Sequence, residues 1–177
     1  MRTILTTLLF CGLAASHAMA AEQKKPEPAH AAAAASPKEI GKFDDWTAAT
    51  HVESGQTVCY AFTRVQNSVP SLPDRGPVIL TVTERASGRD AVAIEAGFSY
   101  GPKASVTVQV DQTGLDFYTA QRNAFARDGH AAVAALQRGE RAIARSPGPK
   151  DAPVTDTFSL KGFSAAYAAI VKACPAK

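Results

Sequence analysis

Three kinds of side chain in this sequence could carry chemistry: cysteine thiols, histidine imidazoles and a group of arginines. The cysteines are Cys11, Cys59 and Cys174, and the last two lie more than a hundred residues apart. In an oxidising compartment such a pair forms a disulfide by default. Two buried free thiols, or one reactive thiol, are the alternatives. A zinc site is disfavoured, because neither Cys59 nor Cys174 has a CxxC partner or a pair of histidines nearby.

His51 and His130 are the acid–base candidates near neutral pH in the body of the chain. His51 precedes Cys59 by eight residues, which would suit a cysteine nucleophile, but a disulfide would consume that thiol. No G-x-S-x-G motif or Gly-rich phosphate loop is present, and the aspartates are scattered among turns. We therefore expect no catalytic residue, no metal site and no cofactor. A periplasmic hydrolase with a Ser–His–Asp arrangement is the alternative from another class.

Arginines cluster in the second half of the chain. One interpretation is a basic contact surface for anionic envelope lipids; the plainer one is a solvated face. Loss of Arg2 with a signal peptide would lower the basic residues from 19 to 18 against 16 acidic ones, a net charge of +2. So small a charge, with no basic-aromatic pattern, argues against nucleic acid as a partner. The arginines of this candidate surface are Arg122, Arg127, Arg138, Arg141 and Arg145.

The first twenty residues have the layout of a secretory signal. Arg2 precedes a short apolar run, and residues 18–20 (AMA) supply an A-x-A cleavage site. The run is shorter than the about 20 apolar residues of a membrane span, so we expect no transmembrane span after cleavage; a retained anchor is the alternative. Residues 21–40 are rich in Ala, Pro and Lys and predict a flexible tether. Residues 41–177 then form a single domain.

The elements that must position these residues are mostly strands. PVILTVTER places Val78, Leu80 and Val82 on one face, and AVAIEAGF and ASVTVQV repeat this alternation. Further strands are expected at GLDFYTA, near residues 141–146 and over residues 153–158, whereas residues 119–127 read as a helical turn or a loop. Trp46 is expected to anchor the core from a first strand. Short, regularly spaced strands predict an antiparallel β-sandwich.

Two helices are expected beside the strands. A short internal helix should run from Gly129 to Arg138, with Asp128 as N-cap and Gly139 as its end. A C-terminal helix should begin at the N-cap Ser159 and end before Pro175. Its apolar residues fall within about 100° of one another on a helical projection. They are Leu160, Phe163, Tyr167, Ile170, Val171 and Cys174.

The strand around Cys59 predicts where the C-terminal helix packs. In VCYAF, Tyr60 and Phe62 lie on one face, and Cys59 and Ala61 lie on the other. If the aromatic side chains fill the sandwich interior, then Cys59 must be covered from outside its sheet. We therefore expect the helix to pack on an outer sheet face, held there by the disulfide to Cys174.

The order of these landmarks resembles the invasion-associated locus B family of exported bacterial proteins. The resemblance extends from about Lys42 to Pro175 and rests on FDDWTA, VCYAF, TVTER, GFSYGP, AALQRGERAIAR and DTFSLKGFSAAYAAIVKACP. It implies an immunoglobulin-like β-sandwich, a periplasmic or envelope location, and a disulfide at Cys59 and Cys174. It implies no catalytic residue. The family's namesake is tied to erythrocyte invasion by a pathogen, and the long tether departs from the family pattern.

The sequence therefore predicts an exported, non-enzymatic binding or structural domain in the periplasm or envelope. Its partner would be an envelope or host-surface component. A surface or secreted factor that assists host-cell invasion is the alternative interpretation of the same fold, because fold alone does not fix function.

Overall fold

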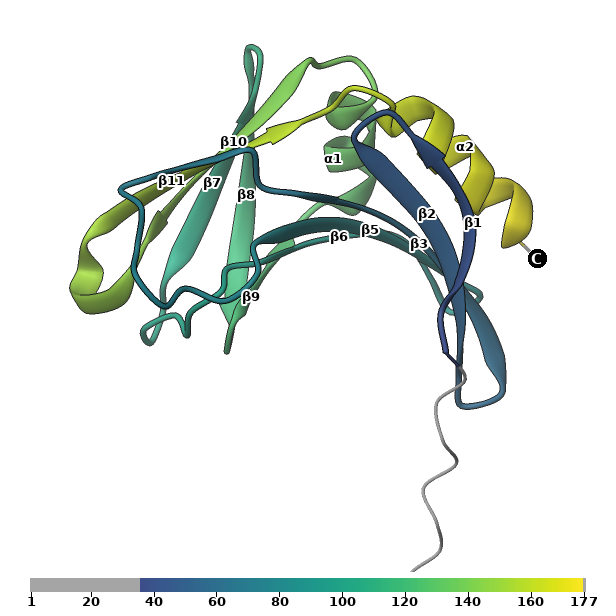
Figure 1. Ribbon diagram of the computed structural model, residues 1–177, viewed down its shortest axis with the longest axis horizontal. Coiled ribbons are helices and arrows are strands. Elements are labelled where there is room, and N and C mark those ends of the chain that lie inside the picture. The colour runs from purple at the N-terminus through teal and green to yellow at the C-terminus, as the bar shows by residue number, and fades with distance from the viewer. Residues whose placement is uncertain (1–35, 177) are drawn as a thin grey trace, which may run out of the picture. The chain divides into compact units, whose positions relative to one another are not determined.

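The computed structural model describes residues 36–176, so the predicted signal peptide lies outside the described residues. Within this range the chain forms eleven strands, two α-helices and one turn of 3₁₀ helix, η1 (Figure 1). The first strands are β1 (Lys38–Phe43), β2 (Trp46–Glu53), β3 (Gln56–Arg64), β4 (Asn67–Val69), β5 (Ile79–Arg85) and β6 (Gly88–Glu95). The later elements are β7 (Ser105–Val110), β8 (Thr113–Ala120), β9 (Asn123–Ala126), α1 (Gly129–Leu136), β10 (Arg141–Pro147), η1 (Pro149–Asp151), β11 (Pro153–Ser159) and α2 (Phe163–Ala173).

The strands form one antiparallel sheet in the order β1-β2-β3-β5-β6-β9-β8-β7-β10-β11-β4. The sheet folds over within the described domain, so that the strands β7, β8, β10 and β11 form a second layer (Figure 1). After β3 the chain crosses to the far edge of the sheet, where β4 pairs with β11. Beside this pairing, the N–H of Gln66 donates to the carbonyl of Thr157 over 2.8 Å. The predicted β-sandwich is confirmed, as a single sheet folded over rather than two separate sheets.

Alternation along the strands sets the buried face, as the sequence predicts. In β5, Leu80 and Val82 are buried, and in β6 the buried residues are Val92 and Ile94. In the other layer, the valines of β7 and Phe117 of β8 are buried in the same core. Full burial of each such apolar side chain contributes about 1.5–3 kcal/mol. These residues belong to one hydrophobic core that both helices complete.

The internal helix α1 forms where it was predicted, with Asp128 as its N-cap. The Asp128 carboxylate accepts from the N–H of Ala131 over 2.9 Å. The helix ends at Leu136, two residues before the expected Arg138. A Cβ at Gly139 would overlap Val110, so the chain must turn at a glycine there.

The C-terminal helix begins later than predicted, and the assignment of Ser159 as its N-cap is wrong. Ser159 is the last residue of β11, and the N-cap of α2 is Gly162, whose φ is 89°. A Cβ at Gly162 would overlap the carbonyl of Phe43 in β1, so this close approach requires glycine. The helix ends at Cys174 as predicted. Its residues Phe163 and Ile170 are buried against β1, β2 and β3.

Residues 119–127 form a hairpin rather than the expected helical turn or loop. Strand β8 continues to Ala120, Gln121 turns the chain with a φ of 55°, and β9 follows. Ala124 is buried in the core and Phe125 stacks on Tyr118 across the hairpin. The alternation of small and aromatic residues in NAFA therefore outweighs its helix propensity.

The domain begins slightly earlier than the sequence suggested. Strand β1 starts at Lys38, three residues before the expected boundary at Gly41, and pairs with β2 through a bulge after Glu39. Among residues 36–176, neither helix has the length and apolarity needed to cross a membrane.

Candidate functional site

The sheet face formed by β2, β3 and β5 and turned away from both helices is the candidate binding surface, here called the open face. In β3, Cys59 and Ala61 are buried toward the helices, whereas Tyr60 and Phe62 are half-buried on the open face. The prediction that these two aromatics fill the sandwich interior, with the helix outside, is therefore wrong. Trp46 and Phe163, 4.7 Å apart between ring centroids, occupy that interior and leave room only for small residues of β3.

Side chains of the open face surround a hollow of about 580 Å³. Its aromatic members contact one another: the rings of His51 and Tyr60 are 5.4 Å apart edge to face, and those of Tyr60 and Phe62 are 6.0 Å apart and stacked. Such arrangements favour a firm apolar surface. The hollow is lined by Pro37, His51, Tyr60, Phe62, Arg64, Ile79, Thr81, Thr83 and Arg85.

The lining of this hollow carries positive but no negative charge. Arg64 and Arg85 contribute guanidinium groups, and none of the nine lining residues has a carboxylate. At the rim, Arg85 Nε lies 2.9 Å from Glu53 Oε2, and this hydrogen bond lowers the pKa of the exposed Glu53. Apolar rings beside guanidinium groups suit a molecule that has both an apolar part and an anionic group.

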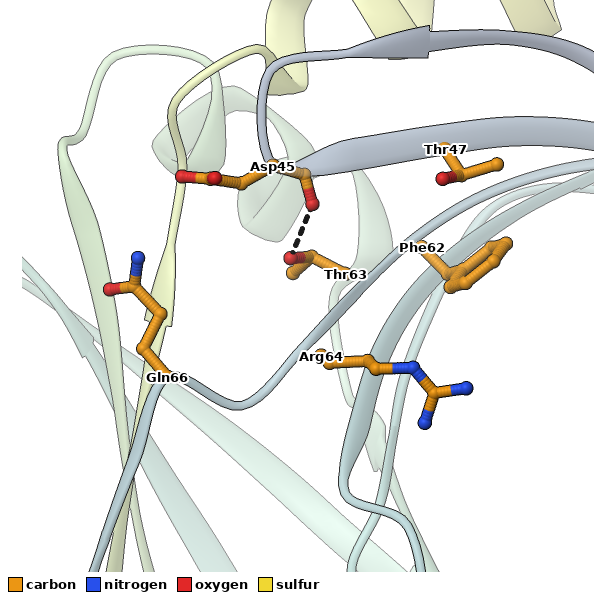
Figure 2. Close-up of a pocket in the computed structure, with 6 residues that line it drawn as sticks. All are labelled: Asp45, Thr47, Phe62, Thr63, Arg64 and Gln66. Carbon is orange, nitrogen blue, oxygen red and sulfur yellow. Dashed lines mark hydrogen bonds between the residues drawn. The ribbon is translucent and has the colours of Figure 1, made fainter.

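A smaller hollow of about 280 Å³ adjoins the first, because Phe62 and Arg64 line both. Figure 2 shows Phe62 and Arg64 on one side of β3, while Thr63 points the other way toward Asp45. The hydroxyl of Thr63 donates to the carbonyl of Asp45 over 2.7 Å and fixes the end of β3 against the start of β2. The two hollows therefore share Phe62 and Arg64, and the smaller one extends toward Thr63 and Asp45 at the end of β3.

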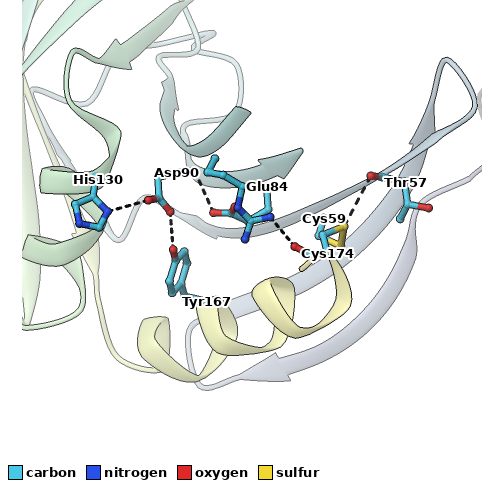
Figure 3. Close-up of polar contacts among 8 residues, drawn as sticks. Thr57, Cys59, Glu84, Asp90, His130, Tyr167 and Cys174 are labelled. Carbon is cyan, nitrogen blue, oxygen red and sulfur yellow. Dashed lines mark hydrogen bonds and ion pairs between the residues drawn. A yellow bond between two sulfur atoms is a disulfide. The ribbon is translucent and has the colours of Figure 1, made fainter. Parts of the chain in front are cut away.

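A polar cluster lies on the other side of the sheet, which the helices cover. It connects α1, α2 and the β5–β6 hairpin. Figure 3 shows Tyr167 of α2 pointing at Asp90, with His130 of α1 approaching the same carboxylate. Tyr167 donates to Asp90 Oδ1 over 2.5 Å, and His130 Nδ1 lies 3.1 Å from Asp90 Oδ2. The N–H of Asp90 donates to Glu84 Oε1 over 3.1 Å. Glu84 itself is fully buried.

The charges of this cluster perturb one another. Burial raises the pKa of Glu84 to about 7; the Asp90 carboxylate adds to the effect, whereas the Asp90 N–H and Arg89 oppose it. Arg89 Nε lies 2.6 Å from Glu84 Oε2, but no N–H is aligned for a hydrogen bond to that oxygen. For Asp90, burial acts to raise the pKa, but hydrogen bonds from Tyr167 and His130 and the contact with Glu84 hold it below its usual range.

The predicted disulfide between Cys59 and Cys174 is present, with a Cα–Cα distance of 6.0 Å. Cys59 is fully buried and faces Glu84 across the β3–β5 pair. Cys174 lies at the edge of a hollow of about 390 Å³ beside the β2–β3 turn. Arg89 Nη1 donates to the carbonyl of Cys174 over 2.5 Å, so the polar cluster also contacts the end of α2.

The two histidines occupy different settings. His51 lies among the open-face aromatics, whereas His130 is 90 % exposed and contacts Asp90. Among residues 36–176 no serine or threonine hydroxyl bonds to either imidazole. In the same part of the chain no group of three or more His, Cys, Asp or Glu residues could hold a metal ion.

The five arginines of the predicted basic surface come from several elements. Arg141 and Arg145 are exposed on the same face of β10, and Arg127 lies at the end of β9, 5.7 Å above the ring of Tyr118. Arg138 follows α1, while Arg122 lies in the β8–β9 turn. That turn is at the opposite end of β9 from Arg127.

Three buried charged side chains, Glu84, Arg75 and Asp156, were not predicted from the sequence. Glu84 follows the alternation of Leu80 and Val82 and so falls on the buried face, a signal present in TVTER. Arg75 lies in a loop, and its guanidinium binds Asp156 with two hydrogen bonds of 2.8 and 2.7 Å. No local sequence pattern predicts this pair, because its members are 81 residues apart.

The fold and these sites define a β-sandwich domain whose last helix is joined to an early strand by a disulfide and whose outer aromatic face is uncovered among the described residues. The chain belongs to the invasion-associated locus B family, whose model matches residues 46–171.

A solved structure shares the fold. The crystal structure of invasion associated protein B from Bartonella henselae is similar, with a TM-score of 0.55 and 18 % sequence identity over 75 % of this chain and 96 % of that chain. No curated protein matches the sequence significantly.

Proposed function

We propose that this protein is an exported, non-enzymatic envelope protein that binds an anionic lipid at its open face. The observation that carries the proposal is the lining of the larger hollow: stacked aromatic rings, Arg64, and Arg85 with its bond to Glu53 at the rim, and no carboxylate among the lining residues. Aromatic and aliphatic side chains would contact the upper part of the acyl chains, and Arg64 and Arg85 would contact the phosphate.

Export is part of the same proposal. Residues 1–20 have the composition of a signal peptide, and residues 21–37, which precede β1, have that of a tether. A disulfide persists in an oxidising compartment such as the periplasm. Cleavage after residue 20 would be read from the N-terminal mass of the protein in a periplasmic extract. Digestion by protease added to intact cells would contradict a periplasmic location and favour a surface role in host-cell invasion.

The binding proposal is tested with vesicles. Residues 21–177 should sediment with vesicles containing phosphatidylglycerol and not with pure phosphatidylcholine, and binding should weaken as salt rises. Because one basic residue near an anionic membrane contributes about 1 kcal/mol, Arg64→Gln should weaken binding about fivefold. The double variant Tyr60→Ala/Phe62→Ala should weaken it further.

Matched variants on other surfaces serve as controls. Arg145→Gln removes an exposed arginine from β10, and Tyr118→Ala removes an aromatic that is 45 % exposed on β8. Both should bind vesicles as the parent does. Loss of binding in Arg145→Gln with full binding in Arg64→Gln would assign the lipid to the arginines of β10 and overturn the open-face proposal. Equal binding to both vesicle types would overturn it as well.

A further inference from the structure

The two sulfurs of the disulfide have unequal surroundings. Cys59 is 0 % exposed and lies in the hydrophobic core beneath α2. Cys174 is partly exposed and lines the 390 Å³ hollow together with the β2–β3 turn and the C-terminal residues that follow it. A thiolate from solution can therefore approach the Cys174 sulfur, whereas the Cys59 sulfur is shielded. Since exchange requires direct attack on one sulfur, accessibility selects Cys174.

A proton-carrying group lies beside the shielded sulfur. Glu84 and Cys59 are directly opposite each other in the β3–β5 pairing and face the same side of the sheet. Side chains in such positions have Cβ atoms roughly 5 Å apart. Glu84 Oε1 accepts from the N–H of Asp90, while Oε2 lies 2.6 Å from Arg89 Nε in an ion pair without an aligned hydrogen bond. Figure 3 shows Glu84 and the disulfide on the same side of the sheet, beside the end of α2.

We propose that the Cys59–Cys174 bond is a thiol–disulfide exchange site, at which an external dithiol attacks Cys174 and Glu84 transfers a proton to Cys59. This activity is independent of lipid binding and uses residues on the other side of the sheet. The co-reactant is a dithiol of the kind carried by thioredoxin-like reductases or by dithiothreitol.

The exchange reaction has two steps. One thiolate of the dithiol forms a bond to Cys174 Sγ, and the electron pair of the Sγ–Sγ bond leaves on Cys59 Sγ. The Glu84 carboxyl gives its proton to that thiolate and regains one from solvent. The second thiolate of the dithiol then attacks its partner sulfur in the mixed disulfide and releases Cys174, which takes a proton from solvent. Two electrons pass to the protein, and the dithiol becomes a disulfide.

The position of Glu84 bears on the costly step of this reaction, the release of the Cys59 thiolate in the core. A thiolate released into an apolar core is costly because burial disfavours charge. Proton transfer from the neighbouring carboxyl moves that charge to Glu84, where Arg89 Nε lies 2.6 Å from Oε2 as a counter-charge. The same burial raises the pKa of Glu84 to about 7, so part of the carboxyl carries a proton near neutral pH. In the reverse direction, the ionised carboxylate accepts the proton of Cys59 as the bond forms.

The first test maps the attacked sulfur in the unmodified protein. Residues 21–177 are incubated with glutathione, quenched with iodoacetamide and digested, and the two cysteine peptides are analysed by mass spectrometry. We expect glutathione on Cys174 and the alkyl group on Cys59. Glutathione on Cys59, or exchange only after the chain is unfolded in urea, would overturn the proposal.

The second test separates proton transfer from a structural role of Glu84. The rate of reduction by dithiothreitol, divided by the thiolate concentration, is measured from pH 5.5 to 8.5 for the parent and for Glu84→Gln. The parent rate should fall as Glu84 ionises. Glu84→Gln should be at least about tenfold slower at pH 6, since a positioned acid typically contributes 10²–10⁴-fold, and its profile should be flat. If Glu84 merely stabilised α2, its replacement would loosen the helix and speed reduction.

Two controls accompany the rate measurement: a matched variant and a test of folding. Glu53→Gln makes the same chemical change at an exposed carboxylate on β2 and should reproduce the parent profile. Near-UV circular dichroism reports whether Glu84→Gln is folded. If it is not, Glu84→Asp retains a carboxyl and should keep a pH-dependent rate. A flat profile in the parent protein would overturn the assignment of Glu84 without any variant.

Discussion

The indole N–H of Trp46, at the start of β2, donates to the carbonyl of Ser159, at the end of β11, over 3.0 Å. The two residues are 113 positions apart, and Trp46 is fully buried. The bond fixes the last residue of the sheet before the chain turns into α2, whose Phe163 packs on the same indole. Trp46 therefore contacts both the end of the strand that leads into α2 and the first residue of that helix.

Trp46→Phe should lower the free energy of unfolding by about 1–3 kcal/mol. The substitution leaves the carbonyl of Ser159 without its donor and removes part of a buried ring, and an unpaired buried acceptor alone costs about that amount. Urea unfolding followed by far-UV circular dichroism measures the change. Arg145→Gln, on the exposed face of β10, should stay within about 0.5 kcal/mol of the parent. A loss as small for Trp46→Phe would contradict this role.

Gly162→Ala should destabilise the domain by at least about 2 kcal/mol. Its φ of 89° costs any other residue about 1–3 kcal/mol, and the added Cβ would overlap the carbonyl of Phe43. Gly88→Ala is the matched control, because no atom lies within 4 Å of a Cβ at that position. The two variants are compared by thermal unfolding, and equal midpoints would show that α2 can shift to accommodate the methyl group.

The stability of the domain should depend on the protonation of Glu84. Its pKa in the folded state, about 7, lies above its ordinary value of 4.5. The folded state therefore binds this proton more tightly, and the resulting stabilisation is complete below pH 4.5 and lost as pH rises through 7. Asp90, whose pKa is lowered, acts in the opposite sense at more acidic pH.

The measurement compares the parent with Glu84→Gln between pH 5 and 8. The free energy of unfolding of the parent minus that of the variant should fall by about 2.5 kcal/mol over this range, because one pKa unit corresponds to about 1.36 kcal/mol and most of the shift from 4.5 to about 7 lies within it. The subtraction removes the titration of groups that both proteins share. A difference that stays constant with pH would show that Glu84 ionises in the folded state at its ordinary pKa.

Breaking the buried pair of Arg75 and Asp156 should cost about 3–5 kcal/mol. Both side chains are less than a tenth exposed, and Asp156→Asn leaves the Arg75 guanidinium without its counter-charge. The exposed pair of Arg85 and Glu53 provides the comparison, since Glu53→Gln should cost about 0–1 kcal/mol. Denaturant unfolding of Asp156→Asn, Arg75→Met and the double variant gives the coupling energy. A coupling near zero would mean that Arg75 is held by its other bond, to the carbonyl of Ala96.

The elements of this fold were predictable where one periodicity dominates. Strands such as β5 and β7 alternate over their whole length, and α1 has a cap residue before it and a glycine after it. Residues 119–127 were not predictable in the same way, because NAFA suits a short strand as well as a helix. The start of α2 depends on the contact of Gly162 with Phe43, which no local pattern contains.

The sites were less predictable than the elements. Alternation shows that Tyr60 and Cys59 point in opposite directions, but it does not show which direction is the core. That choice depends on Trp46 and Phe163, which come from elements far away in the sequence and fill the interior. The disulfide was predictable because only one pairing remains when Cys11 is set aside.

The pairing of Cys59 with Cys174 has a consequence for biogenesis. A chain that emerges N-terminus first presents Cys59 long before its partner, which follows 115 residues later. Strand β4 likewise emerges long before β11, the strand with which it pairs. Beyond residue 20 the sequence has no third cysteine with which the early thiol could form a wrong intramolecular bond. The Cys59 thiol thus has a single intramolecular partner beyond residue 20, and this bond can close only after almost the whole domain has emerged.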